Sequence, residues 1–576
     1  MGFAHRRLSI LDLSERGHQP FHSADGRFTI VYNGEIYNFT EFRKELINKG
    51  YNLYSSTDTE VLLYLIIEYG PNVLHRLNGM FAFAVWDKLE QKLILCRDRM
   101  GVKPLYYTIF ENSLYFASEP KALFAAGVPL EIDEKKWDEH LIYRYVAGES
   151  TIFKGVNRLL PGHFVTCKDG KISFTRWWNL SERVRQHETI KNPLEWFDNT
   201  FQDSVRYRMV SDVPVGVLLS GGLDSSSVLA SLYRQNFKVS CFNIGFDDKI
   251  HDESALARSF SEILGYPFFS TRLEDENLLK TLEDSSWYHD EPLIHNNDPH
   301  LLAISRLAKK HVSVLLSGEG SDELMAGYVR YRVWRYKPFF SLLKVTLPLY
   351  NGLKKNLRSI KLQRYLRIRN NRDKLLLNAS NLFPEDFYEL GIKNLEPSIE
   401  YRSTILKEAE DLYPGQPLRQ LLYLDQHTYL CSLLDRNDRS TMGAGIECRE
   451  PFLDYRLVEG LATLPVSWFD KGKKGKFILL QSMKKFLPPE IVNHRKIGLS
   501  VPWTTYLLKN KVFSERMSEM KNSEVFKYGI FKSFNVEKLI ANFYQNPELF
   551  GTIINQFFII YIWYETYFKR IKEFQY

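Results

Sequence analysis

The sequence predicts two domains of different class: an α+β domain over residues 1–180 and an α/β domain over residues 195–576 that ends in a helical part. Three patterns predict this division. Short β-type runs broken by turn residues dominate the first half. Strands that alternate with helical segments follow residue 193, and such alternation indicates a parallel sheet. Beyond about residue 330 the pattern is mostly helical.

In the first half, the runs FTIVY, MFAFAVWD, KLILCRD and SLYFAS are predicted strands, and Asn33-Gly34 is a predicted turn after the first of them. Two helices are predicted between these strands. One covers about residues 40–49, and the other runs from a cap at Thr57 to a stop at Gly70.

The second half begins after a polar stretch, residues 181–193, that has almost no apolar periodicity and is predicted to be a linker. The runs VGVLL, SCFNIGF and VSVLL are then predicted strands of a parallel sheet. Residues 553–568 are predicted to form a buried helix, because polar residues interrupt the stretch and it is too short to span a membrane. Residues 354–374 carry nine Lys or Arg and one acid. A solvated basic face explains this stretch, and contact with an acidic partner, tRNA or an anionic lipid surface is the alternative.

Composition narrows the class of protein. Hydrophobic residues make up 44% and charged residues 25%, which excludes a largely disordered chain. The net charge of +7 is weak for 576 residues and does not indicate nucleic acid as a partner. The five cysteines are widely spaced without a C-x-x-C pair, which argues against a disulfide framework or zinc site. The N-terminus lacks the layout of a signal peptide, so we expect a cytoplasmic protein without a membrane span.

The most specific pattern is VLLSGGLDSS at residues 217–226, where a buried strand enters a glycine-rich turn that opens a helix. Backbone N–H groups and the helix N-terminus there favour an anion, and the glycines let a phosphate approach closely. An aspartate in the turn would repel phosphate unless a cation lay between them, which implies Mg²⁺. A turn that merely ends a strand is the alternative. The predicted phosphate-site residues are Ser220, Gly221, Gly222, Asp224 and Ser225.

A second turn, SGEGSDE at residues 317–323, follows the run VSVLL. Ligands sit at the carboxyl ends of parallel strands, so this acidic turn is expected at the same sheet edge as the first loop. Asp322 is then the second predicted Mg²⁺ ligand beside Asp224. Two carboxylates and no P-loop lysine suggest cleavage of ATP at the α-phosphate, giving an adenylate and pyrophosphate. A Ca²⁺ site is the alternative, but the EF-hand spacing is absent.

The loop SGGLDSS resembles that of the N-type ATP pyrophosphatases, a group that includes argininosuccinate, GMP and NAD synthetases. With LSGEGSDELMAGY, HDEP, DRSTMGAGIECREPFLDYRLVE and GKFILLQSM, the region from about 200 to 505 resembles the synthetase domain of glutamine-dependent asparagine synthetase. The resemblance implies an adenine-nucleotide alpha-hydrolase-like ATP pyrophosphatase fold.

The same resemblance implies roles for individual residues. Glu319 would act in formation of an aspartyl-adenylate, and Lys476 would neutralise charge at the α-phosphate, although a solvated lysine is the alternative there. Arg449 and Asp454 would either order the site or form a structural ion pair. The residues implied to line the adenine and ribose are Leu218, Ile244, Ser317 and Gly318.

The first half resembles the N-terminal-nucleophile (Ntn) glutaminase domain of that family, a class II amidotransferase, through HRRLSILDLS, GHQP, NGEIYN, TDTEV and CRDRMGVKPLYY. By this resemblance Arg7 would hold the α-carboxylate of glutamine, Glu35 and Asp58 its α-amino group, and Asn33 with the Gly34 N–H would form an oxyanion hole. A guanidinium binds a carboxylate, a carboxylate attracts an ammonium, and an amide side chain with a backbone N–H can donate to an oxyanion. A surface ion pair for Arg7 and a plain hairpin turn at Asn33-Gly34 are the alternatives.

The start departs from the family pattern. The family begins Met-Cys-Gly-Ile with the cysteine as nucleophile, whereas position 2 here is glycine and no Cys, Ser or Thr lies near. We therefore expect an incomplete glutaminase-like domain that lacks its first segment and, as written, does not hydrolyse glutamine. Loss of strands there would expose a sheet edge.

The expected enzyme is an ATP- and Mg²⁺-dependent ligase that converts aspartate to asparagine, with glutamine in an intact relative, or ammonia for this chain as written, as nitrogen donor. Two alternatives stay open. One is transfer to another carboxylate, such as a uronic acid, or attack by an internal amine; the other is a catalytically silent remnant. The expected partners are small molecules, and whether the chain forms a homodimer is left open.

Overall fold

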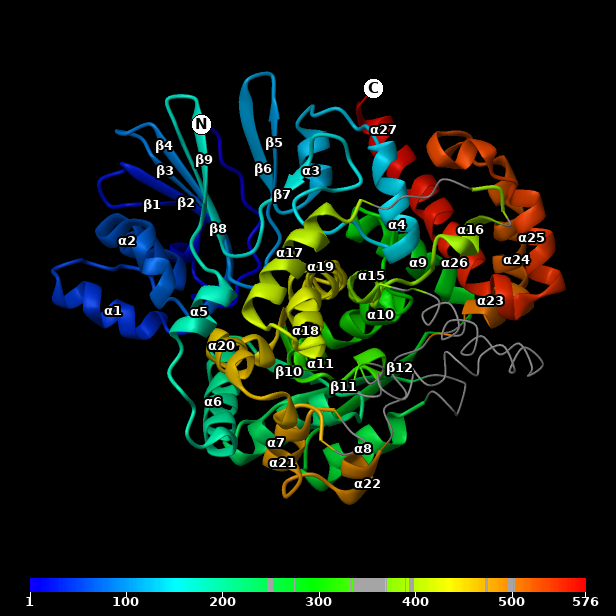
Figure 1. Cartoon of the computed structure of the whole chain (residues 1–576). Coiled ribbons are helices and arrows are strands. Elements are labelled where there is room, and N and C mark those ends of the chain that lie inside the picture. The colour runs from blue at the N-terminus through cyan, green and yellow to red at the C-terminus, as the bar shows by residue number, and fades with distance from the viewer. Residues whose placement is uncertain are drawn as a thin grey trace.

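The computed structural model in Figure 1 describes residues 1–245, 252–273, 275–331, 334, 368, 370–388, 390–392, 398–471, 475–494, 501 and 503–575. The basic stretch predicted at 354–374 therefore lies largely outside the described residues. All five cysteines are free thiols, as their spacing predicts.

The first half is built on a six-stranded antiparallel sheet of order β1-β2-β3-β4-β8-β9. Its strands are β1 (Phe21–His22), β2 (Phe28–Ile36), β3 (Gly79–Asp87), β4 (Lys92–Arg97), β8 (His163–Lys168) and β9 (Lys171–Arg176). A smaller sheet of order β6-β5-β7 contains β5 (Tyr106–Phe110), β6 (Ser113–Ala117) and β7 (Asn157–Arg158). The first half also contains α3 (Pro120–Ala125) and α4 (Trp137–Tyr143).

Both helices predicted in this half are present, as α1 (Phe39–Asn48) and α2 (Asp58–Tyr69). The Thr57 side chain caps α2 by accepting a hydrogen bond from the Glu60 N–H, and Gly70 ends the helix. The predicted turn at Asn33-Gly34 is wrong. Both residues lie inside β2 and pair with Ala82 and Phe81 of β3.

Gly34 is required there by packing, because a Cβ at this position would overlap the main-chain oxygen of Met80 on β3. The dipeptide that usually marks a hairpin therefore marks a close approach of two strands.

The predicted linker is partly helical. Residues 180–186 form α5 (Leu180–Gln186), capped by the Asn179 side chain, and Leu180 is fully buried. Only the residues between α5 and α6 (Pro193–Arg208) lack regular structure. The apolar contacts of α5 come from Leu180, which precedes the polar run, and from Val184, which packs against the core.

The second half is built on a five-stranded parallel sheet of order β12-β11-β10-β13-β14. The three predicted strands are β10 (Val215–Leu218), β11 (Ser240–Gly245) and β13 (Val314–Leu316), and β12 (Phe268–Arg272) and β14 (Glu447–Arg449) complete the sheet. The helices that follow or connect these strands are α7 (Leu223–Arg234), α8 (Ser254–Ile263), α9 (Asp275–His289), α10 (Asp298–Ala308) and α11 (Ser321–Met325).

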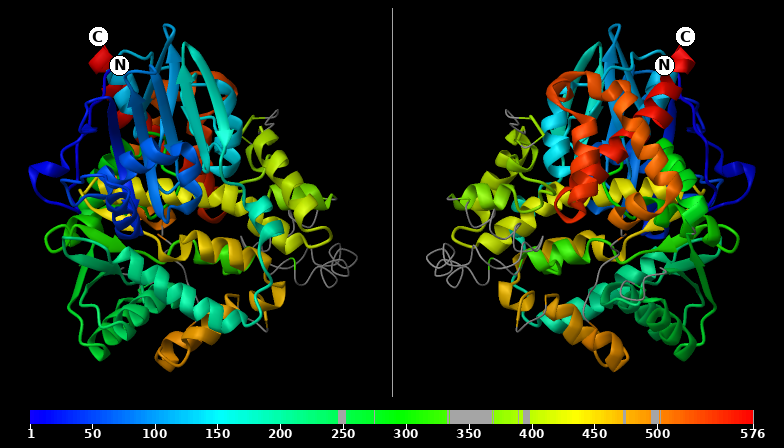
Figure 2. Two further views of the ribbon diagram at one scale, coloured as in Figure 1. Left: turned by 90° about the vertical axis from the view of Figure 1, so that its left-hand side faces the viewer. Right: turned by 90° about the vertical axis from the view of Figure 1, so that its right-hand side faces the viewer.

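The remainder is helical, as the pattern predicts. Its main helices are α15 (Asn371–Leu376), α16 (Glu385–Tyr388), α17 (Glu400–Leu412), α18 (Pro417–His427), α19 (Tyr429–Met442), α20 (Tyr455–Thr463), α21 (Phe477–Met483), α22 (Pro489–Asn493), α23 (Trp503–Lys509), α24 (Lys511–Glu519), α25 (Val536–Gln545), α26 (Pro547–Trp563) and α27 (Lys569–Gln575). In Figure 2 the blue antiparallel sheet and the red C-terminal helices lie at one end of the molecule, and the teal α6 lies toward the other.

The predicted buried helix at the C-terminal end is confirmed as α26 and the π-helical turn Tyr564–Phe568. Its polar residues have partners. Gln556 donates to the carbonyls of His140 and Leu141 at 2.8 and 2.9 Å, and Asn555 donates to Asn296. Among the helices in the described part of the chain, none has the length and apolar character that crossing a membrane requires.

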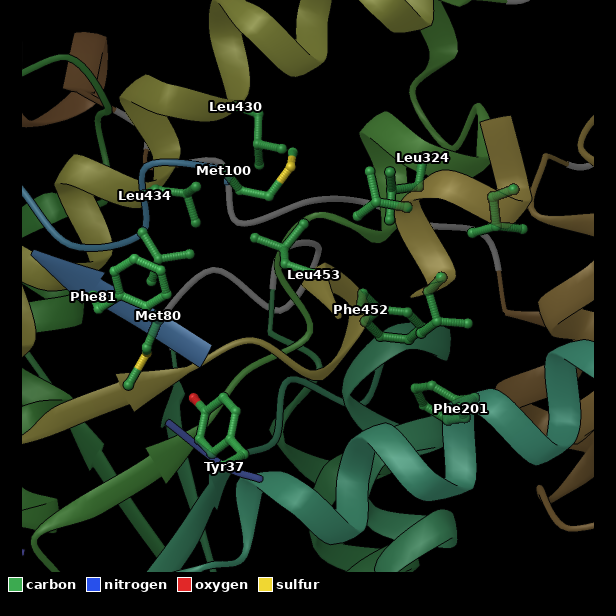
Figure 3. Packing of buried hydrophobic residues seen from close by; sticks show 14 of the residues in the cluster. Tyr37, Met80, Phe81, Met100, Phe201, Leu324, Leu430, Leu434, Phe452 and Leu453 are labelled. Atoms are coloured by element: carbon green, nitrogen blue, oxygen red, sulfur yellow. The ribbon is translucent and has the colours of Figure 1, made fainter. Parts of the chain in front are cut away.

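One hydrophobic core runs through both halves. Figure 3 shows Met80 and Phe81 of the antiparallel sheet and Met100 of the first half beside Leu430 and Leu434 of α19 and Leu453. Buried ion pairs surround this core. Asp454 accepts hydrogen bonds from Arg208 at 2.7 Å and from Asn78 at 2.9 Å, and it also pairs with Arg456.

Replacing Asp454 with alanine is expected to destabilise the protein by about 3–5 kcal/mol, because Arg208 would remain buried without its carboxylate partner. The midpoint of chemical or thermal unfolding measures this cost. Asp203→Ala is the matched control, since it removes a partly exposed partner of the same Arg456, which Asp203 shares with the exposed Arg206, and should cost less than about 1 kcal/mol. Equal losses in the two variants would contradict the expectation.

Candidate functional site

The loop after β10 is held by hydrogen bonds among its own serines. Ser220 Oγ accepts a hydrogen bond from the Gly222 N–H at 3.3 Å and lies 3.1 Å from Ser225 Oγ. Gly221 has a φ of +85°, a conformation that favours glycine. The loop leads directly into α7, whose first turn presents backbone N–H groups to the same space.

The acidic turn lies against this loop because β13 is the neighbour of β10 in the sheet. Gly318 makes the approach possible: a Cβ there would lie 2.9 Å from Asp224 Cβ and 3.1 Å from the Ser225 nitrogen. Ile244 is the next-to-last residue of β11, which lies on the other side of β10, and the adjacent Asn243 donates to the Leu219 carbonyl at 2.8 Å. The structure thus brings the predicted nucleotide residues to one edge of the sheet.

Lys476 enters this site from the start of α21. Its Nζ donates to both carboxylate oxygens of Asp224 at 2.7 and 2.6 Å and to Ser321 Oγ at 2.8 Å. It also lies 2.8 Å from Asp322 Oδ1. Only 6% of its side chain is exposed, which excludes the solvated-lysine alternative.

The backbone at Lys476 packs closely against the segment that follows α11. The residue has a left-handed φ of +58°, and its N–H donates to the Met325 carbonyl at 2.9 Å. A Cβ on Gly327 would overlap both Asp322 Oδ1 and Lys476 Cε, and a Cβ on Gly475 would overlap the Ala326 carbonyl oxygen. These two glycines allow the lysine to reach between the two aspartates.

The two predicted metal ligands, Asp224 and Asp322, converge on one cation, the Lys476 ammonium. A pair of carboxylates facing a common cation position is a suitable donor set for Mg²⁺ when phosphate oxygens complete the coordination. In the parts of the chain that the structure describes, no group of three or more His, Cys, Asp or Glu could hold a metal alone. The arrangement therefore fits a cation that arrives with a phosphate ligand.

Glu319 forms an ion pair with Arg436 of α19. Arg436 is almost fully buried and also donates to Asn297 at 3.3 Å, at the start of α10. Sequence reasoning missed Arg436. The sequence shows only a polar run, DRNDR at residues 435–439, and that all five of these residues are buried becomes visible only in the structure.

The residues implied to bind glutamine come from three segments: Arg7 lies before the first strand, Asn33, Gly34 and Glu35 lie in β2, and Asp58 begins α2. Arg7 donates to the carbonyls of Leu11 and Asp12. Asp58 accepts from the Tyr32 hydroxyl at 2.7 Å and from the Ile36 N–H at 2.9 Å, and burial raises its pKa to about 6. Burial lowers the pKa of Arg7, while the carboxylates of Asp12, Asp58 and Glu35 oppose this shift.

Glu35 faces the second half of the chain. Its Oε1 lies 3.2 Å from Arg449, a fully buried side chain that also donates to Glu447 at 2.8 Å. Lys103 lies 3.0 Å from Asp438 and 3.8 Å from Glu447. Arg449 therefore belongs to a buried charge network between the halves, which favours the structural role over direct ordering of the nucleotide loop.

The comparisons with known proteins match both halves. Residues 1–178 match a glutamine amidotransferase domain family, and residues 197–559 match the asparagine synthase family. The chain is 33% identical to asparagine synthetase [glutamine-hydrolyzing] 1 of Bacillus subtilis, over 89% of this chain and 81% of that protein. It is 30% identical to a putative asparagine synthetase of Mycobacterium tuberculosis, over 87% and 79% of the two chains. It is also 30% identical to amidase chyE of Penicillium rubens, over 86% and 80%.

These matches define a two-part enzyme in which an amidotransferase domain precedes a synthase domain. The chain belongs to the asparagine synthase family. The family resemblance and the enzyme class predicted from the sequence, a ligase of the glutamine-hydrolysing asparagine synthase type, are confirmed.

Gly327→Ala is expected to displace Lys476 or Asp322 and to lower the rate of pyrophosphate release by on the order of a hundredfold. Gly127→Ala is the control. Its Cβ would meet no atom within 4 Å, although its φ of +97° carries backbone strain. The control should lose stability but keep its activity, and thermal unfolding beside the rate assay separates the two effects. Full activity in Gly327→Ala would contradict the assigned close packing.

Proposed function

We propose that the chain converts aspartate to asparagine through an aspartyl-adenylate, with ATP as the activating substrate and ammonia, free or released from glutamine, as the nitrogen source. The observation that supports this most directly is the contact of Lys476 with both Asp224 and Asp322 beside the Ser220 loop. They bring a lysine ammonium, two carboxylates that could hold a cation, and phosphate-binding N–H groups together at the carboxyl edge of a parallel sheet. We also propose residues 1–180 and 195–576 as the two domains.

In the first step, the β-carboxylate of aspartate attacks the α-phosphorus of ATP, and pyrophosphate leaves. Ser220, Ser225 and the N–H groups of the loop would hold the leaving phosphates, and Lys476 would offset the charge that develops at the α-phosphate. Mg²⁺ held by Asp224 and Asp322 would supply further neutralisation of the phosphate charge. Glu319 would help to position the reacting carboxylate.

In the second step, ammonia attacks the acyl carbon of the adenylate, and AMP leaves. The proposed glutamine site uses Arg7 for the α-carboxylate, Asp58 and Glu35 for the α-ammonium, and the Asn33 side chain with the Gly34 N–H for the oxyanion. Residues of the shared core in Figure 3 adjoin both proposed sites, since Met80 pairs with Glu35 across β2 and β3, and Leu453 packs against Gly320 of the acidic turn. Such an apolar region would keep a neutral amine from protonation by water.

Transfer to a different carboxylate is a second candidate, because relatives at 30% identity include a protein named amidase chyE. Such an enzyme would use the same adenylating groups with another acceptor. The two candidate functions differ in the carboxylate that binds in the acceptor pocket, so a direct comparison of acceptor substrates distinguishes them.

With Mg-ATP, aspartate and ammonium, the chain is expected to release pyrophosphate and to form AMP and asparagine in equal amounts. A coupled pyrophosphate assay with amino-acid analysis measures this. Omission of aspartate, and its replacement by glucuronate, should leave only background release, and a parallel reaction with glutamine measures the contribution of the first domain. Release with glucuronate but not with aspartate would favour the second candidate.

Glutamine affinity is expected to increase as pH rises through about 6, because burial raises the pKa of Asp58 to that value and only the ionised carboxylate attracts the ammonium. Calorimetric titration with glutamine over roughly pH 5 to 8 measures the effect. Asp58→Asn is the matched control, which should bind more weakly and without this pH dependence. The same pH dependence in both proteins would exclude Asp58 as its source.

A further inference from the structure

A narrow cavity lies between the two halves, and four of its lining residues, Tyr37, Met80, Met100 and Leu453, are labelled in Figure 3. Both halves contribute to its wall. The first half supplies Tyr37, Asn78, Met80 and Met100, and the second supplies Leu453 and Glu450. Glu450 is a buried carboxylate directly after β14, in a wall that also contains the charged side chains of Asp98, Arg99 and Arg208, and no step described so far uses it.

The carboxylate of Glu450 is incompletely hydrogen bonded. Its Oε1 accepts a long hydrogen bond of 3.4 Å from Asn437 Nδ2. Its Oε2 is buried and accepts no hydrogen bond from an N–H or O–H group in the described part of the chain, and the Cys448 thiol, a weak donor, is the other hydrogen-bonding group beside the carboxylate. Burying a carboxylate with only a long amide contact and a thiol as donors costs free energy, so such a group calls for a functional explanation.

Glu450 also lies close to the synthetase site. Its partner Asn437 follows Arg436, the residue that holds Glu319. The titratable groups next to Glu450 are Lys103, whose charge lowers its pKa, Glu319, whose charge raises it, the Cys448 thiol and the Tyr37 hydroxyl. Asp98, Arg99, Arg208 and Tyr455 line the same cavity. Burial is the largest influence and raises the pKa of Glu450 to about 7. Both protonation states are then accessible near neutral pH, as a general base requires.

We propose that Glu450 accepts the proton that ammonia loses when it attacks the acyl-adenylate. This inference rests on the proposed function and adds a catalytic residue to its second step. The nitrogen lone pair forms the new C–N bond, the bond between the acyl carbon and the phosphate oxygen breaks, and AMP leaves with those electrons. One N–H proton passes to Glu450 Oε2. The position suits this role because the carboxylate faces the cavity between the halves on one side and neighbours Glu319 on the other.

The test compares Glu450→Gln with the wild type in two assays. Aspartate-dependent exchange of pyrophosphate into ATP reports the first step and should stay within about threefold. Asparagine formed from ammonium should fall by roughly a hundredfold, so pyrophosphate release becomes uncoupled from amide formation. Glu450→Asp should recover part of the amide yield. Glu408→Gln is the control, because it removes another carboxylate between the halves, the partner of Arg176, and should change neither assay.

A pH profile supplies a readout that a structural role would not affect. At a constant concentration of free ammonia, the wild-type rate of amide formation should rise with pH through about 7 as Glu450 loses its proton, and the profile of Glu450→Gln should be flat. Equal loss of exchange and amide formation in Glu450→Gln, or a flat wild-type profile, would overturn the proposal. A wild type that lacks aspartate-dependent exchange would instead overturn the proposed function, and this inference with it.

Discussion

The buried guanidinium of Arg449 is the interaction on which the arrangement of the two halves depends. Its nitrogens reach Glu35 on the antiparallel sheet, Glu447 on β14, and the carbonyls of Arg208 and Val210 after α6. A planar side chain with five donors can fix three segments at once, which a lysine cannot do. Such a buried network contributes little net stability, but the loss of one member leaves a charge without compensation. The network therefore fixes the position of β2 relative to β14 more than it stabilises either sheet.

Close backbone packing is the second constraint, and it acts at the nucleotide site. There is no space for a side chain at Gly318 or Gly327. Because these residues are glycine, the Ser220 loop, the acidic turn and Lys476 can lie in direct contact. Proximity of this kind places charged groups at fixed separations before any substrate binds. Positioning and electrostatic preorganisation are the principal sources of rate enhancement in phosphoryl and adenylyl transfer.

Much of this site could be predicted from the sequence because its main parts are short continuous motifs. The loop at 217–226 and the turn at 317–323 each carry their own glycines and acids, and strand alternation places them on one edge. Arg436 and Glu450 could not be found in this way, since their contacts with Glu319 and with the cavity wall depend on how α19 and β14 pack. Asn33-Gly34 shows the opposite error: a strong turn signal was overridden by the pairing of β2 with β3, where glycine serves a close strand contact. The helix α5 was missed because tertiary packing of Leu180, and not periodicity, stabilises it.

The C-terminal helix α26 has a consequence for the order in which the protein can fold. Trp563 packs edge-to-face against Trp137 of α4, with ring centroids 6.1 Å apart, and Gln556 binds two carbonyls of that helix. The apolar surface of α4 thus belongs to a core whose other side lies more than four hundred residues later in the chain. During synthesis this surface of the first half stays exposed until α26 has been made. Contacts of such long range slow folding and create an interval in which the nascent chain is prone to aggregation.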